Sequence, residues 1–248
     1  YVDLDLRLTE YVRVRGGVRG DVLYYGIDDA LGNFIPRFRR DTYIPGYRRS
    51  AAGVAVGPRV SVEFTPLPEL ALSVAYGEGY RSPQARQLAD GESAPFAKVR
   101  SADLGGRLRL GDHHELEVSL TGFVTNLSAD VAFDPGEGRL EAIGPSTRLG
   151  FAAAVATRPW EFLTGALSVT YVRATLDAPP LASAEDPDPP YRSGQLLPYV
   201  APWVVRADLG AHGTLFHLGD WDFDGRLGVG FSFLSPRPLP FGAFADPI

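Results

Sequence analysis

Apolar and polar residues alternate along ten stretches of the chain, and the stretch from Tyr11 to Tyr24 shows this pattern most clearly. Val12, Val14 and the valines that follow fall on even positions, whereas arginines and an aspartate fall on odd positions between Arg13 and Asp21. Successive side chains of a β-strand point to opposite faces. The pattern therefore predicts a strand with one apolar face and one heavily charged face.

The same alternation predicts an all-β chain of about ten antiparallel strands. We find no convincing stretch with helical period, and no apolar run approaches the roughly 18 residues that a membrane-spanning helix needs. The expected strands lie near Tyr1–Leu8, Tyr11–Tyr24, Val54–Phe64, Leu70–Tyr76, Asp103–Leu110, Leu116–Thr125, Leu149–Val155, Leu163–Tyr171, Trp203–His212 and Asp222–Phe233.

The connections between these strands fall into two kinds that alternate strictly along the chain. Short turns such as Thr9-Glu10 and Pro66–Glu69 are followed by much longer loops, one of which holds Asp130, Asp134, Glu137 and Arg139. Long structureless loops are uncommon in compact soluble domains. Short periplasmic turns alternating with long extracellular loops are typical of up-and-down transmembrane β-barrels, and this is the architecture that we expect.

The charged face decides between a barrel and a dry sandwich. An arginine that faces lipid near the bilayer midplane costs about 2–4 kcal/mol, and an unpaired charge in a dry core costs several kcal/mol more. Beside Asp3 and Asp5 in a wet lumen the cost is small. The side chains expected to face this lumen are Arg13, Arg15, Arg19, Asp21, Arg59, Glu63, Asp103, Arg107, Arg206, Asp208 and Arg226.

Aromatic residues gather at both ends of the expected strands, as in the aromatic girdles of membrane barrels. Those near the long loops are Tyr24, Tyr25, Tyr76, Tyr171 and Trp203, and those near the short turns are Phe64, Trp160, Phe162 and Trp221. Composition adds little: the chain of 248 residues has net charge −6 and no cysteine. The acidic balance argues against a nucleic-acid partner, and the missing cysteines exclude disulfides and Cys-zinc sites.

Two segments resemble TonB-dependent outer-membrane receptors. Tyr76-Gly77-Glu78-Gly79-Tyr80-Arg81-Ser82-Pro83 is similar to their strand-to-loop segment, and Val12 to Asp21 is similar to their "Leu-x-Leu-x-x-Gly-x-Arg-x-Asp" barrel strand. Gly122-Phe123-Val124-Thr125 resembles the "Gly-Tyr-Tyr-Thr" of the same family, with Phe123 at an inward position. The resemblance covers nearly all of the chain, and the order and spacing of these motifs carry it.

The resemblance implies a function in uptake across the outer membrane of a Gram-negative bacterium. Such receptors have a closed barrel of 22 strands around an N-terminal plug, and they import scarce nutrients such as ferric siderophores or cobalamin with energy from the TonB complex. This chain begins inside a strand and shows no plug, TonB-binding segment or terminal strands, so we expect it to supply middle strands of such a barrel. The inward arginines would then grip the plug or simply solvate the lumen.

Expected ligand contacts lie in the first two long loops. The first loop carries cationic and aromatic side chains that would bind an anionic or aromatic chelate by charge and stacking: Arg37, Arg39, Arg40, Tyr43, Tyr47 and Arg48. Tyr80, Arg81 and Gln84 stand at the root of the second loop. A solvated loop in the first case, and a role in fixing the departure of the loop in the second, remain open alternatives.

No catalytic residue, metal site or cofactor is expected. Adjacent His113 and His114 would face apart in a turn, which is poor metal geometry, and Glu185, Asp186 and Asp188 lack the glycine spacing of an EF-hand. Three other functions stay open: a passive pore or smaller closed barrel, an outer-membrane enzyme with His212 or His217 at its rim, and a soluble adhesin-like sandwich. Three observations distinguish these functions from the expected one. They are the number of strands, the residues at the barrel rim, and the side of the sheet on which the apolar rows lie.

Overall fold

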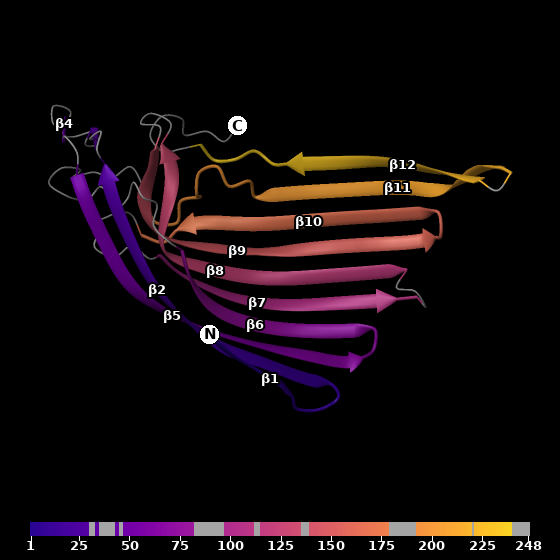
Figure 1. Cartoon of the computed structure of the whole chain (residues 1–248), viewed down its shortest axis with the longest axis horizontal. Helices are drawn as coiled ribbons and strands as arrows, with labels where there is room; N and C mark the ends of the chain where they lie inside the picture. The colour runs from indigo at the N-terminus through magenta and orange to yellow at the C-terminus, as the bar shows by residue number, and fades with distance from the viewer. Residues whose placement is uncertain are drawn as a thin grey trace.

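The computed structural model describes residues 1–29, 33–34, 43–44, 47–81, 97–111, 115–134, 139–178, 192–219 and 221–239. Within these residues, ten antiparallel strands form one sheet in which every strand pairs with its neighbour along the chain (Figure 1). A second sheet contains two short strands. The described residues contain strands, turns and loops but no helix, so the expected all-β, up-and-down chain of about ten long strands is confirmed.

The strands have the following bounds. The large sheet consists of β1 (Val2–Arg7), β2 (Val12–Asp29), β5 (Tyr47–Leu67), β6 (Leu70–Arg81), β7 (Ala97–Leu110), β8 (Leu116–Asp134), β9 (Arg139–Trp160), β10 (Leu163–Leu176), β11 (Trp203–Leu218) and β12 (Trp221–Leu234). The small sheet pairs β3 (Asn33–Phe34) with β4 (Tyr43–Ile44).

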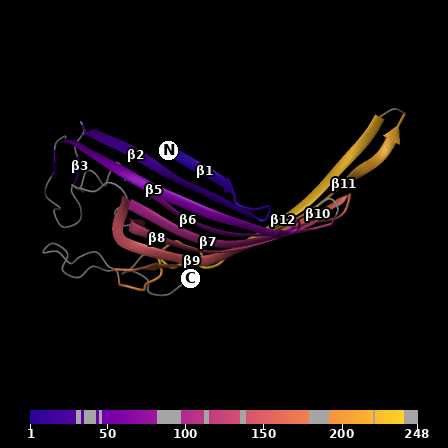
Figure 2. The same cartoon turned by 90° about the horizontal axis from the view of Figure 1, so that it is seen from below.

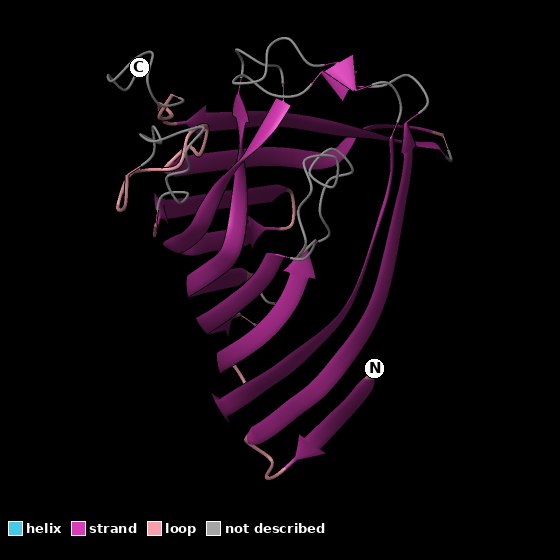
Figure 3. Ribbon diagram, turned by 90° about the vertical axis from the view of Figure 1, so that its left-hand side faces the viewer, coloured by secondary structure: helices cyan, strands magenta, loops and turns pink. Residues whose placement is uncertain are grey.

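The large sheet is curved into an open trough (Figures 1 and 2). The hairpin turns after β1, β5, β7, β9 and β11 gather at one end, which we call the turn end, and the other connections leave from the opposite loop end. Among the described strands, only β2 pairs with β1, and only β11 pairs with β12. Each of these two edge strands therefore has one backbone side without a described strand partner, and the sheet formed by the described residues does not close on itself (Figure 3).

Cross-strand register keeps all apolar rows on one face, which we call the apolar face. Val62 lies opposite Val14 on one side and Val74 on the other, and across the sheet Leu167 pairs with Val155 and Ala207 in the same way. The apolar side chains do not pack against another layer, since the paired Val22 and Val54 are 81% and 74% exposed. The alternative of a sandwich with these rows pressed together is therefore excluded for the described strands.

Several strands run further toward the loop end than the sequence predicts. β8 and β9 continue to Asp134 and Arg139, so the expected long loop around Asp130 is wrong, and residues 135–138 alone connect the two strands. The ladder survives because backbone hydrogen bonds require no alternation of side chains. The register slips at bulges between Leu127 and Asp130, and these slips remove the period on which the sequence prediction depends.

A small hydrophobic core lies at the loop end, where β9, β10 and residues 192–202 meet. Ile143, Ala174, Leu176 and Leu197 are its buried members. Residues 192–197 run beside β10: the backbone N–H of Leu197 donates to the carbonyl of Ala174, and that of Leu176 to the carbonyl of Gln195, both at 2.9 Å. This core fixes the loop-end part of the β8–β9 hairpin relative to the sheet.

Candidate functional site

The face opposite the apolar rows, which we call the polar face, carries ion pairs that link successive strands. Asp5 on β1 binds both Arg13 and Arg15 of β2. Asp3 reaches over β2 to β5, where Nη2 of Arg59 donates to its Oδ2 at 2.6 Å. Gly17 of β2 makes this bridge possible, because a Cβ at this position would coincide with the Asp3 carboxylate and approach Nε of Arg59.

Further ion pairs occur along the same face. Arg19 pairs with Asp21, Arg109 with Glu117, and Arg206 with Asp208, each at 2.8 Å. The side chains in these pairs are partly to largely exposed, so each pair contributes about 0–1 kcal/mol at most to stability. Residues of opposite sign therefore pair with one another along this face.

The remaining residues expected to face the lumen also lie on the polar face. Glu63 lies opposite Arg13 in the register of β2 and β5, and the hydroxyl of Ser101 donates to Asp103 at 3.4 Å. The register places Arg107 opposite Ser119 and Arg226 opposite His212. The register thus brings all residues of this expected set to one face of the sheet.

The polar face has two hollows that differ in the residues that line them. Asp3, Asp5, Arg15 and Arg59 line a hollow of about 590 Å³ over β1 to β7. A second hollow of about 730 Å³ lies over β8 to β12, and its lining consists largely of small residues, including Ala156, Ala166, Gly210, Gly228 and Gly230. Charged side chains are therefore more numerous around the first hollow, whereas small residues make up most of the lining of the second.

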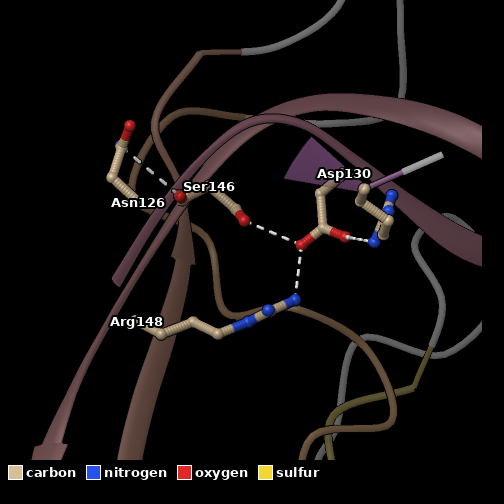
Figure 4. Close-up of polar contacts among 5 residues, drawn as sticks. Asn126, Asp130, Ser146 and Arg148 are labelled. Atoms are coloured by element: carbon tan, nitrogen blue, oxygen red, sulfur yellow. Dashed lines mark hydrogen bonds and ion pairs between the residues drawn. The ribbon is translucent and has the colours of Figure 1, made fainter. Parts of the chain in front are cut away.

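The most deeply placed charge in the described residues is Asp130 of β8, whose side chain is 2% exposed. Its carboxylate accepts from Oγ of Ser146 at 2.7 Å and Nη2 of Arg148 at 2.6 Å, both on β9 (Figure 4). Nη1 of Arg81, the last residue of β6, donates to the other carboxylate oxygen at 3.3 Å. This cluster joins the β8–β9 hairpin to the root of the second long loop.

Sequence reasoning found only one member of this cluster. The sequence predicts Arg81 at the root of the second loop and Asp130 in the long loop after the sixth expected strand, and it does not single out Ser146 or Arg148. Three strands contribute to the cluster, and the bulge beyond Leu127 sets how Asp130 meets its partners. No spacing along the chain predicts this contact, because residues 81 and 130 are brought together only by the folded sheet.

A second polar cluster reinforces the same region. Nδ2 of Asn126 donates to Oγ1 of Thr147 and Oδ2 of Asp177, both at 3.1 Å. The Thr147 hydroxyl donates to the same Asp177 oxygen at 2.8 Å, and the Ser193 hydroxyl donates to the Asp177 carbonyl at 2.6 Å. These bonds tie β8 and β9 to the chain that leaves β10.

The other expected ligand contacts are only partly described. The Tyr80 hydroxyl donates to the carbonyl of Val56 at 2.9 Å, which fixes β6 against β5 and agrees with the alternative of a structural role. Tyr43 lies in β4, and Tyr47 and Arg48 begin β5, but their side chains are outside the description. Arg37, Arg39, Arg40 and Gln84 lie outside the described residues.

Aromatic side chains of the apolar face meet in two rows. At its loop-end row, Tyr171 lies 4.7 Å from Trp203 and 5.8 Å from Phe151 between ring centroids. At its turn end, Trp160 stacks on Phe162 at 5.8 Å and Phe216 on Phe223 at 4.5 Å. The arrangement matches the two expected girdles, which mark the two water interfaces of a membrane.

The described residues contain neither a candidate metal site nor a candidate membrane-spanning helix. No group of three or more His, Cys, Asp or Glu residues there is arranged to hold a metal ion. His113, His114, Glu185, Asp186 and Asp188 lie outside those ranges. Among the residues described, no helix has the length and apolarity to cross a membrane.

The comparison with protein families follows this geometry. Residues 1–244 match the family described as TonB dependent receptor-like, beta-barrel. The chain belongs to this family. The resemblance expected from the motifs is thus confirmed, and the trough is a part of a TonB-dependent receptor barrel. Among curated proteins, no sequence match was found.

Solved structures of receptors share this fold. The ferric yersiniabactin uptake receptor FyuA from Yersinia pestis matches with TM-score 0.67 at 16% identity, covering 96% of this chain and 34% of that chain. The ferric-catecholate import receptor Fiu from E. coli K12, in its closed form, matches with TM-score 0.63 at 14% identity, covering 84% and 30%. The copper transporter OprC matches with TM-score 0.61 at 16% identity, covering 95% and 34%.

These low identities establish the fold and nothing about ligands. The chain spans about a third of the length of each of these three solved structures.

Proposed function

We propose that this chain forms middle strands of a TonB-dependent receptor barrel in the outer membrane of a Gram-negative bacterium, where the complete receptor imports a scarce nutrient. The observation that carries the proposal is the division of the sheet into two faces. An apolar face continuous over ten strands suits acyl chains, and a charged face suits a hydrated lumen. Family membership connects this wall with nutrient uptake.

The short turns would lie in the periplasm and the loop end outside the cell, as in other barrels of this membrane. The receptor's own plug is the proposed partner of the charged wall. The ion pairs around Asp3, Asp5 and Arg59 are partly exposed, so their arginines retain N–H donors for carboxylates of the plug. The TonB complex would act through the plug and reach no part of this wall directly.

The ligand would be a small molecule or metal chelate that enters from the loop end. The similar receptors and the copper transporter include proteins that take up ferric yersiniabactin, ferric catecholates or copper. Their uptake chemistry supports a metal chelate, such as a ferric siderophore, as the class of ligand. The matched family is described as receptor-like, and the solved structures that share the fold are uptake receptors and a transporter, which supports transport rather than catalysis.

Single-channel conductance of the full-length protein in planar bilayers tests this proposal. A barrel filled by a plug is expected to give no stable open channel, whereas a version lacking the segment before the barrel is expected to conduct. A steady conductance from the full-length protein would instead show a passive pore. The upstream reading frame offers an independent check, because it should encode a plug, and a frame without one contradicts the proposal.

A further inference from the structure

Asp130 is bound by more guanidinium groups than a structural ion pair requires. One buried carboxylate needs one guanidinium to compensate its charge, yet Asp130 is bound by both Arg81 and Arg148, with neutral Ser146 as a third donor. Among these four residues, two guanidinium groups therefore share one carboxylate. Because the Asp130 side chain is 2% exposed, its carboxylate is out of contact with the lumen, and the guanidinium groups form the accessible part of the cluster.

The two guanidinium groups are the exposed part of the cluster. The side chains of Arg81 and Arg148 are 40% and 32% exposed. Each uses one terminal nitrogen on Asp130, and a guanidinium has five N–H donors in a fixed fork. Donors therefore remain for a second anion on the lumen side, and the buried carboxylate holds both groups in place before any ligand arrives, which lowers the entropy cost of binding.

The surface next to Arg148 suits a small organic anion. Thr125 lies opposite Arg148 in the register, and its hydroxyl is 3.1 Å from that of Ser101. Two residues toward the turn end, the ring of Phe123 lies over Gly150, where a Cβ would contact its Cζ. Hydroxyl groups and an aromatic face therefore adjoin the two cations, and all of them lie on the polar face.

We propose that Arg81 and Arg148, positioned by Asp130, form a binding site for a small carboxylate-bearing anion at the loop end of the lumen. The inference rests on the proposed function, because it places the entering ligand on the inner side of the barrel. Two arginines favour carboxylate groups, which accept paired N–H bonds from the guanidinium fork. Phe123 would pack against the less polar part of the same ligand.

Isothermal titration of the full-length receptor in detergent with citrate, a tricarboxylate probe, tests the site. Wild-type receptor is expected to bind citrate, with affinity that falls as salt is raised. Arg81→Gln and Arg148→Gln are each expected to weaken binding by roughly tenfold, the scale of one charge-assisted hydrogen bond. Arg148→Lys keeps the charge but not the fork and is expected to show an intermediate loss.

Arg109→Gln is the matched control, because Arg109 also pairs with a carboxylate of a neighbouring strand on the polar face but lies in the part of β7 near the turn end. Its citrate affinity is expected to equal that of wild type. If Arg148→Gln does not fold, Arg81→Gln carries the test, since its bond to Asp130 is the longer one. Absence of citrate binding in wild type, or equal affinity in Arg81→Gln and wild type, would overturn the proposal.

This experiment is independent of transport. Citrate binding that depends on the two arginines, found together with a steady open conductance, would retain the anion site and reject the receptor function. A full-length protein that gives no open channel and does not bind citrate would retain the receptor function and reject the anion site. The two proposals can therefore fail separately.

Discussion

At the scale of single residues, neighbours along one strand meet different solvents. Leu120 of β8 is 55% exposed on the apolar face, whereas Thr121 follows it on the polar face, opposite Gly105 and Ala152. Leu120 lies opposite Ala153, two residues from the level of Phe151 in the loop-end aromatic row, and so within the apolar band on the side of the loop end. The alternation that the sequence shows thus becomes a difference in environment between adjacent side chains.

Substitution of Leu120 or Thr121 by arginine measures the difference in environment between the two faces. Leu120→Arg is expected to lower the free energy of unfolding of the receptor in lipid vesicles by about 1–3 kcal/mol, because the guanidinium would face acyl chains between the midplane and the loop-end interface. Thr121→Arg, the matched control, places the same group in the wet lumen and is expected to change little. Equal losses in urea unfolding of the two variants would contradict the assignment of the faces.

Gly17 offers a second test at this scale. Gly17→Ala is expected to destabilise the receptor by about 1–3 kcal/mol, because the new Cβ would displace Asp3 from its bridge to Arg59 and press on the carbonyl of Val2. Gly20→Ala is the control, since a Cβ there meets no atom within 4 Å. Urea unfolding of both variants should separate them, and similar midpoints would show that the bridge does not depend on the glycine.

At the scale of elements, the sequence predicts the membrane-crossing parts of the strands better than their loop-end extensions. Inside the membrane one face meets lipid and the other meets the lumen, so selection imposes a period of two on the side chains. Beyond the aromatic rows both faces of β8 and β9 meet polar or mixed surroundings, and Asn126 and Thr147 occupy positions that continue the apolar rows. The period disappears there, although the backbone ladder continues.

The β8–β9 hairpin yields a prediction about local stability. Asp130→Ala would leave Arg81 and Arg148 without their common acceptor, and the hairpin amides of residues 139–146 are expected to lose about 1–3 kcal/mol of protection in hydrogen exchange. Asp208→Ala removes the carboxylate from an exposed pair on β11 and should leave those amides unchanged. Unaltered exchange in Asp130→Ala would show that the hydrophobic core around Ile143 suffices to hold the hairpin.

At the scale of the whole molecule, the edges of β1 and β12 have no strand partner among the described residues, and the proposed larger barrel would supply one for each. An exposed edge presents a row of free N–H and C=O groups, and these are not tolerated within a bilayer. The apolar face, with side chains such as Leu227 at 79% exposure, likewise needs lipid around a closed wall. Both requirements point to the complete receptor barrel as the folding unit.

Residues 1–248 produced alone test this requirement. We expect the isolated chain to aggregate in detergent and to lack the heat-dependent shift in gel mobility of a folded barrel, because its two edges have no partners. The full-length receptor, as control, should elute as a single folded species and show the shift. A monodisperse, heat-modifiable barrel formed by residues 1–248 alone would favour the smaller closed barrel over the middle part of a larger one.

The sequence by itself determined the fold class, the number of long strands, the two faces of each strand and, through its motifs, the family. These properties are local, because a period of two and a turn signal are written into neighbouring residues. Only the tertiary structure decided the extent of the hairpins and the meeting of Arg81, Asp130 and Arg148. Those contacts depend on bulges and on register between strands far apart in the chain, and no local pattern of side chains encodes either.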